Sequence, residues 1–296
     1  MRSFVVTIAI LAGVLAMPFD LEEAKRRDAS LYSDDVARHV FFPLAMSTYS
    51  HDPQKCITTA AQGKLRRFVN VQCDIDKQDT CAGYTAVSDA QKAIILSFRG
   101  TSGNSQLVLE IVEALHQMVP FAGGNVAYYF YNAFLSVWNG GMKQDFLALR
   151  NANPGYEIWI TGHSLGGAMA AVAANFIATT QNITGTPVKF MTFGEPRTGD
   201  KNFADAHDSR FPFSFRVIHN HDIVPQVPFP FMGYRHHGAE VWYENTMGNG
   251  ASYKICEQQE DKNCSDGTLD VWEPDHDDYF GLKDGQAWFD SGCPKF

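Results

Sequence analysis

Two things are missing from this chain of 296 residues: a long apolar run beyond residues 4–15, and any block rich in lysine or arginine. It carries 24 Lys and Arg against 33 Asp and Glu, a formal net charge of −9 at pH 7. A transmembrane helix needs about 20 consecutive apolar residues, so the first absence argues against a transmembrane segment. The second, in an acidic chain, argues against nucleic acid or an anionic membrane surface as a partner.

Residues 1–16 have instead the features of a secretory signal peptide. Arg2 supplies the positive charge, residues 4–15 are apolar apart from Thr7, and Val14 and Ala16 are small enough for the cleavage site. The alternative is a membrane anchor, but the run is too short to cross about 30 Å of hydrocarbon. We therefore expect the mature chain to begin near residue 17 and the protein to be secreted and extracellular.

No internal repeat, low-complexity segment or linker rich in Pro, Gly and Ser interrupts the chain, so we expect a single domain over residues 17–296. Apolar runs alternate with helix-like stretches, which is typical of an α/β fold. We expect strands at 92–98, 157–161, 188–193, 214–219 and 239–243. We expect helices at 34–49, with Ser33 as the N-cap, and at 132–150 and 165–180. The stretches 51–81 and 244–296 look more irregular.

The cysteine content is low but even. In an exported chain six cysteines indicate three disulfides, for which 15 pairings exist. A zinc site is the alternative, but the cysteines form no C-x-x-C pair and have no histidine at ligand spacing, so we expect no metal. Asn182 and Asn263 each begin an acceptor triplet for N-glycosylation, a pattern that is common by chance. The cysteines are Cys56, Cys73, Cys81, Cys256, Cys264 and Cys293.

The segment Gly162-His163-Ser164-Leu165-Gly166 matches the pattern G-x-S-x-G. An expected strand precedes it and an alanine-rich helix follows, which is the setting of a nucleophile elbow. The glycines keep side chains out of the tight turn, which presents the Ser164 hydroxyl above the carboxyl end of the strand. The N–H of Leu165 would then face a developing oxyanion. The alternative is a glycine-flanked turn with an idle serine.

A serine nucleophile needs a base, and the base needs an acid that orients it. In this fold type the acid and then the base follow the serine along the chain. Asp222 comes just after an expected strand, on the same rim as the elbow, although an Asx turn or helix cap would also explain it. His236, His237 and His276 all follow Asp222, and the residues alone do not choose among them.

Another expected strand ends at Phe98-Arg99-Gly100-Thr101, where Thr101 would donate toward the same rim. An ordinary strand-end turn is the alternative.

In 105–119, apolar residues recur at helical spacing, while Glu110, Glu113 and Gln117 fall on the other face. This stretch is either a surface helix or a lid that covers the site in water and turns toward lipid. The apolar residues are Leu107, Val108, Ile111, Val112, Leu115 and Val119.

Taken in order, these segments resemble the class 3 lipases, the fungal-lipase-like α/β-hydrolases. The matching stretches are 98–101, 161–168, 192–200 (Thr-Phe-Gly-Glu-Pro-Arg-Thr-Gly-Asp), 219–228, 234–243 and 275–280 (Asp-His-Asp-Asp-Tyr-Phe). The resemblance implies an α/β-hydrolase fold, with a predominantly parallel sheet flanked by helices. It also implies that His276 is the base and Asp222 the acid, that Thr101 and Leu165 form the oxyanion hole, and that 105–119 is a lid.

The resemblance also implies a disulfide pairing and sets a limit on substrate inference. Carried over from related fungal lipases, the pairs are Cys56–Cys293, Cys73–Cys81 and Cys256–Cys264. The family often has a Val-His-x-Gly-Phe element where residues 126–130 read Val-Ala-Tyr-Tyr-Phe. That stretch would border the acyl pocket, so the acyl specificity of known members should not be transferred.

The resulting prediction is a secreted serine hydrolase that needs no metal or organic cofactor. Its expected substrate is a triacylglycerol or related lipid ester at a lipid–water interface. One alternative is an esterase for feruloyl, aryl or short-chain esters with the same fold. Another is a catalytically silent lipid-binding protein, which the complete set of Ser164, Asp222 and His276 disfavours. Acyl-chain length, regiochemistry and oligomeric state are not indicated by the sequence.

Overall fold

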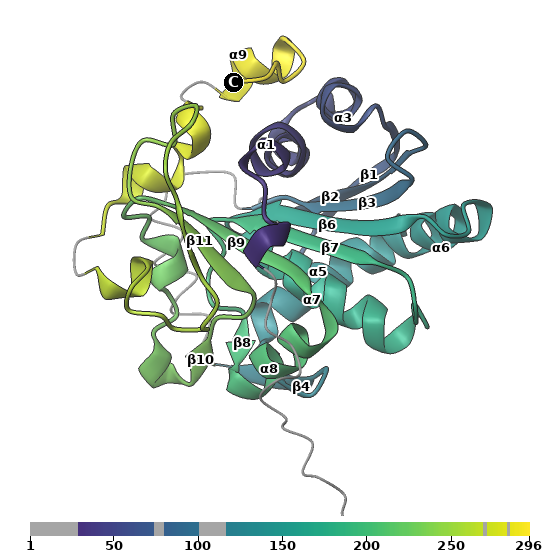
Figure 1. Cartoon of the computed structure of the whole chain (residues 1–296). Helices are drawn as coiled ribbons and strands as arrows, with labels where there is room; N and C mark the ends of the chain where they lie inside the picture. Colours follow the sequence, from purple (N-terminus) through teal and green to yellow (C-terminus); the bar gives the residue numbers. More distant parts are fainter. Residues whose placement is uncertain (1–28, 74–79, 101–116, 269–270, 283–284) are drawn as a thin grey trace, which may run out of the picture.

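A computed structural model of the chain describes residues 29–73, 80–100, 117–268, 271–282 and 285–296 (Figure 1). The expected signal peptide at 1–16, Thr101 and the lid residues Leu107, Val108, Ile111, Val112 and Leu115 lie outside the described residues. Within the described ranges, no helix is long and apolar enough to span a membrane.

The centre of the molecule is an eight-stranded sheet in the order β1-β2-β3-β6-β7-β9-β11-β12. Its five strands from β3 to β11 run parallel, whereas β1, β2 and β12 pair antiparallel at the two edges. The expected α/β architecture is confirmed, and the sheet is mixed. The strands are β1 (Lys64–Gln72), β2 (Thr80–Ser88), β3 (Ala93–Phe98), β6 (Glu157–His163), β7 (Val188–Phe193), β9 (Phe213–His219), β11 (Ala239–Tyr243) and β12 (Lys254–Cys256).

A second, antiparallel sheet has the order β10-β8-β5-β4. Its strands are β4 (Met118–Phe121), β5 (Gly124–Ala127), β8 (Gly199–Asp200) and β10 (Tyr234–Arg235). The expectation that Val119 continues an amphipathic helix is wrong, because Val119 pairs with Val126 between β4 and β5. Strand pairing across the tight turn at Ala122 and Gly123 overrides the helical spacing of the apolar residues.

Helices cover both faces of the large sheet (Figure 1). On one face α7 (Leu165–Thr180) packs against β3, β6 and β7, with α5 (Tyr128–Val137) packed on α7. On the other face α2 (Phe42–Met46) packs against the same three strands. The other helical segments are η1 (Ala29–Leu31), α1 (Asp34–Val36), η2 (Ala37–Phe41), η3 (Ser47–Tyr49), α3 (Pro53–Ala61), η4 (Trp138–Met142), α6 (Lys143–Ala152), α8 (Lys201–Arg210), η5 (Val224–Gln226), η6 (Pro230–Met232), η7 (Ser265–Gly267), η8 (Glu273–His276), η9 (Tyr279–Gly281) and α9 (Gly285–Asp290).

The sheet separates two hydrophobic clusters, one on each face. α7 explains the first cluster, because its small, almost entirely buried residues let it lie close to the sheet. In the second, Phe42 is 1% exposed and its ring contacts Phe193, Tyr279, Phe280, Trp288 and Phe296. The segment that carries His276 is therefore packed, through Tyr279 and Phe280, on the face of the sheet that α2 covers.

The expected N-cap is confirmed, but one expected irregular stretch is not. The Ser33 side chain accepts a hydrogen bond from the Val36 N–H. The expectation of irregular structure over 51–81 is wrong, because α3 and β1 lie within it. β1 is an edge strand whose many polar residues face solvent, so its sequence shows little apolar alternation. The described residues of 244–296 are irregular as expected, apart from β12 and short helical segments.

The three expected disulfides are all present, joining Cys56 to Cys293, Cys73 to Cys81 and Cys256 to Cys264. The first spans 237 residues of sequence, and the other two span 8 each. A cross-link that closes a longer loop removes more conformational entropy from the unfolded chain. Cys56–Cys293 is therefore the disulfide with the largest expected effect on stability.

We expect the double variant Cys56→Ser/Cys293→Ser to lose about 5 kcal/mol of unfolding free energy, from the chain-entropy relation. The matched variant Cys73→Ser/Cys81→Ser should lose about half as much, since its loop is short. Urea denaturation of both, with free thiols counted to confirm that the other disulfides persist, measures the difference. Equal losses would show that loop closure does not govern the stability.

Candidate active site

Ser164 lies in the turn between β6 and α7, with φ 60° and ψ −133°. This is a sparsely populated conformation for a residue with a side chain, and such strain is found at functional sites. Gly166 permits the turn, because a Cβ at that position would overlap the carbonyl oxygen of Phe98. The expected strand–turn–helix elbow is therefore present at the carboxyl end of a central parallel strand.

The backbone after Ser164 offers a hydrogen-bond donor. Leu165 is the first residue of α7, and the first N–H groups of a helix have no acceptor within the helix. The helix dipole adds partial positive charge at the same end. A negative charge that develops on an atom bound to Ser164 would meet this donor. Thr101, the other residue expected to donate here, lies outside the described residues.

Asp222 and His276 form a buried hydrogen-bonded pair. His276 Nδ1 lies 3.0 Å from Asp222 Oδ1 and 2.9 Å from Asp222 Oδ2. Asp222 also accepts the Tyr279 hydroxyl at 2.7 Å and the Val224 N–H at 2.9 Å. The carboxylate is thus fixed by donors from three directions, and its contact with Nδ1 leaves the Nε2 atom of His276 as the other ring position available for chemistry.

His276 is held next to the elbow by His163, the residue before Ser164. The two imidazole rings stack with centroids 4.5 Å apart. His163 Nε2 lies 3.0 Å from the carbonyl oxygen of His276, and His163 Nδ1 lies 3.1 Å from the Tyr49 hydroxyl. Since a carbonyl only accepts, Nε2 of His163 donates and Nδ1 accepts from Tyr49. The structure thus places the His276–Asp222 pair beside the elbow that carries Ser164, although the sequence spreads these three residues over more than a hundred positions.

The two stacked imidazoles differ in their affinity for a proton. Burial lowers the pKa of His276, but the charge and hydrogen bond of Asp222 outweigh it and raise the pKa above the ordinary 6.5. Burial and the neighbouring His276 lower the pKa of His163 to about 3. Burial raises the pKa of Asp222, but His276 and the Tyr279 hydrogen bond outweigh it and lower the pKa. A proton that enters this site therefore resides on His276.

The other two candidate bases lie elsewhere. His236 and His237 occupy the link between β10 and β11, and each is 1% exposed. His237 Nε2 lies 3.3 Å from Glu195 Oε1, and its ring is 4.0 Å from that of His207. The backbone N–H of His236 donates to Glu260. It is thus His276 that contacts Asp222, while the other two face buried polar groups of the core.

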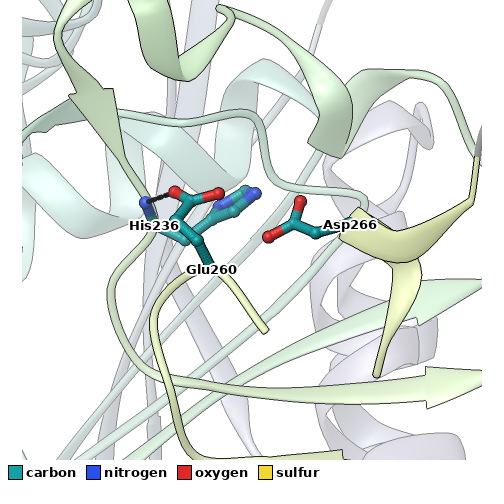
Figure 2. A group of neighbouring side chains, drawn as sticks. All are labelled: His236, Glu260 and Asp266. Atoms are coloured by element: carbon teal, nitrogen blue, oxygen red, sulfur yellow. Dashed lines mark hydrogen bonds between the residues drawn. The ribbon is translucent and has the colours of Figure 1, made fainter. Parts of the chain in front are cut away.

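Among the described residues, His236, Glu260 and Asp266 form a group whose potential ligand atoms lie within 4.8 Å of one another (Figure 2). The guanidinium of Arg197 already supplies positive charge to this group, because its Nη2 atom lies 2.8 Å from Glu260 and 2.7 Å from Asp266. Burial raises the pKa of Asp266 to about 7, so a proton completes the charge balance near neutrality. Burial, together with the charges of Arg216 and Arg197, holds the pKa of His236 well below 6.5. We therefore assign no metal to this group.

Sequence reasoning missed the residues that hold this arrangement in place. Tyr279, the third residue after His276, lies in the matching stretch 275–280, and its hydroxyl donates to Asp222, a role that the sequence analysis does not assign. Its spacing within that segment was the available signal. Tyr49 gave no signal, because it lies 114 residues before its partner His163. His163 was expected only as part of the elbow, without its stacking on the base.

Serine hydrolases of the α/β-hydrolase fold carry the nucleophile on such an elbow, followed along the chain by the acid and then the base. The parallel strands and the order Ser164, Asp222, His276 follow that plan, so the chain is a serine hydrolase of this fold. A family model described as lipase (class 3) matches residues 95–232. The chain belongs to the class 3 lipase family, as individual relatives also show.

A Caenorhabditis elegans protein named Lipase ZK262.3 is 33% identical over 290 residues, which cover 85% of this chain and 80% of that protein. A Fusarium solani protein named secreted mono- and diacylglycerol lipase 1 is 30% identical over 204 residues, which cover 67% of this chain and 59% of that protein. Among solved structures, lipase II from Rhizopus niveus superposes with a TM-score of 0.73 at 26% identity, over 85% of this chain and 95% of that one.

We expect NMR titration of imidazole-labelled protein to give His276 a pKa above 6.5 and to show His163 neutral down to about pH 4, as its pKa of about 3 requires. In Asp222→Asn the His276 pKa should fall, because Asp222 supplies the largest of the negative charges that oppose the effect of burial. His163 serves as the internal control. A His276 pKa that does not change in the variant would contradict the assignment of Asp222 as its charge partner.

Proposed function

We propose that this chain is a secreted lipase that hydrolyses carboxylic esters of lipids with Ser164 as nucleophile, His276 as base and Asp222 as acid. One observation carries the proposal: the imidazole bonded to Asp222 is the one stacked on the residue before Ser164. The chain order and the strained elbow agree with it.

The proposed reaction is acyl transfer to water. His276 Nε2 takes the proton of the Ser164 hydroxyl as the serine oxygen attacks the ester carbonyl, and Asp222 stabilises the resulting imidazolium. The N–H of Leu165 donates to the oxyanion, with Thr101 as the second donor by resemblance, and each contributes about 3–4 kcal/mol. His276 then protonates the leaving alcohol. In the second half it activates water, which releases the acid and restores Ser164.

The proposed substrate is a triacylglycerol or related acylglycerol. Support comes from the family and from relatives whose names include lipase and mono- and diacylglycerol lipase. Secretion is supported by the three disulfides, which persist in oxidising compartments, and by the signal-like residues 1–16. Residues 126–130 depart from the family's usual sequence, so chain-length preference is left to experiment.

Hydrolysis of a p-nitrophenyl ester series alongside an emulsified triacylglycerol tests this function. A lipase should cleave the emulsion and accept long acyl chains. Turnover confined to short or aryl esters would favour the esterase alternative. A fluorophosphonate probe that fails to label Ser164 would favour a silent lipid-binding protein instead.

We expect His276→Ala to lower kcat by about 10⁴–10⁶, the usual effect of removing a triad member. His236→Ala and His237→Ala serve as matched controls, since both imidazoles are equally buried but face other partners. Those variants should lose yield and melting temperature, while the surviving protein keeps its kcat per titrated site. Near-normal turnover in His276→Ala, with loss in either control, would overturn the assignment.

A further inference from the structure

Exposed large hydrophobic side chains are concentrated in two segments, one that follows Asp222 and one that precedes His276. Among the described residues seven such side chains are exposed, and four of them lie in these two segments. Phe229 and Phe231 come shortly after Asp222, and Val271 and Trp272 come shortly before His276. Phe231 is the extreme case, with 85% of its surface exposed. An aromatic ring left in water at such a position indicates an interaction surface.

The two phenylalanines form one preorganised unit. Their rings stack with centroids 5.3 Å apart and planes 11° from parallel. The turn of η6 beneath them is closed by hydrogen bonds from the Met232 N–H to Phe229 and from the Gly233 N–H to Pro230. Proline at 228 and 230 restricts the backbone further. Little conformational freedom therefore remains to be lost when the pair is buried by a partner.

The backbone that leads to the phenylalanine pair is held in place by the buried side chain of Arg197. Arg197 Nη1 donates to the carbonyl oxygens of Pro225, Gln226 and Pro228, at 3.2, 2.7 and 3.2 Å. The Arg197 side chain is only 3% exposed, and its other nitrogens bind Glu260 and Asp266. The chain from Asp222 to the phenylalanine pair is thus braced at several points rather than free.

The charge pattern identifies the kind of partner. Residues 223–234 contain no Asp, Glu, Lys, Arg or His. A charged protein surface or an anionic headgroup would find no counter-charge on this segment, and the net charge of −9 opposes an anionic surface further. An uncharged lipid surface fits, because it removes the rings from water and requires no ionic partner.

We propose that Phe229 and Phe231 form a lipid-insertion tip that binds the surface of neutral acylglycerol. The tip places the segment that follows Asp222 against the lipid droplet that contains the substrate. The inference rests on the proposed function for the nature of that surface. It adds which residues make the contact and that this contact is separate from the chemistry at Ser164.

Binding is measured in the Ser164→Ala background, so that the surface is not hydrolysed during the assay. We compare Phe229→Ser/Phe231→Ser with the control Leu31→Ser/Tyr253→Ser, which removes two exposed apolar side chains outside the two segments. Partitioning is followed on trioleoylglycerol droplets without a phospholipid coat. Loss of the tip should weaken partitioning about 100-fold, at about 10-fold per ring, while the control partitions like the parent.

Two further measurements separate binding from folding and from function. Melting temperature shows whether each variant is folded. In the Ser164 background, removal of the tip should lower the ratio of emulsion to soluble-ester turnover at least 10-fold, whereas the control leaves the ratio unchanged. Tryptophan emission of Phe231→Trp, minus that of the parent, should shift to the blue on droplets.

The results decide the proposal in either direction. A folded tip variant that partitions like the parent, or a Phe231→Trp difference spectrum that droplets do not change, would overturn it. Equal weakening in the control would overturn it as well, since the contact would then be general. An enzyme that binds droplets through the tip but never hydrolyses them would instead refute the proposed function and leave the tip standing.

Discussion

The hydrogen bond between His276 and Asp222 joins two segments 54 residues apart, and much of the surrounding structure serves to keep it in place. A buried carboxylate is costly unless donors and a positive partner compensate for it. Asp222 has His276, the Tyr279 hydroxyl and the Val224 N–H, so it stays ionised with almost no access to water. The pKa of His276 is in turn higher than that of His163, which stacks on it, because His163 lacks a carboxylate partner.

The same constraint explains why the chain beyond β11 is so rich in polar contacts. Asp275 accepts hydrogen bonds from the Asn220 side chain and the His221 N–H, and Trp272 donates its N–H to His221. These bonds fasten the short helix that bears His276 to the segment that bears Asp222. Among the described residues, strand-type pairing between the two segments is limited to an isolated parallel bridge between Asp222 and Trp272, so side-chain and turn hydrogen bonds supply most of the order that a longer strand pair would give.

Parts of this arrangement follow from local sequence, and other parts do not. The elbow and α7 were predictable because strand, turn and helix are contiguous, with glycines where no Cβ fits. The three disulfide pairs and the choice of His276 needed the family resemblance, since 15 pairings and three histidines were equally compatible with the residues. Long-range order was not predictable: the second sheet joins the β4–β5 hairpin to two short strands far away in the sequence, and Tyr49 meets His163 only in the fold.

The bond between Cys56 and Cys293 closes a covalent ring of chain that contains Ser164, Asp222 and His276. A pulling force applied at the two ends of the molecule would be carried across that bond, and would bypass the polypeptide inside the ring. The backbone between the two cysteines, which includes every strand of the sheet and the site, would then carry none of the force transmitted along the chain. An enzyme anchored or tethered by its ends in a flowing or sheared medium would thus keep its geometry mechanically shielded while the disulfide remains intact.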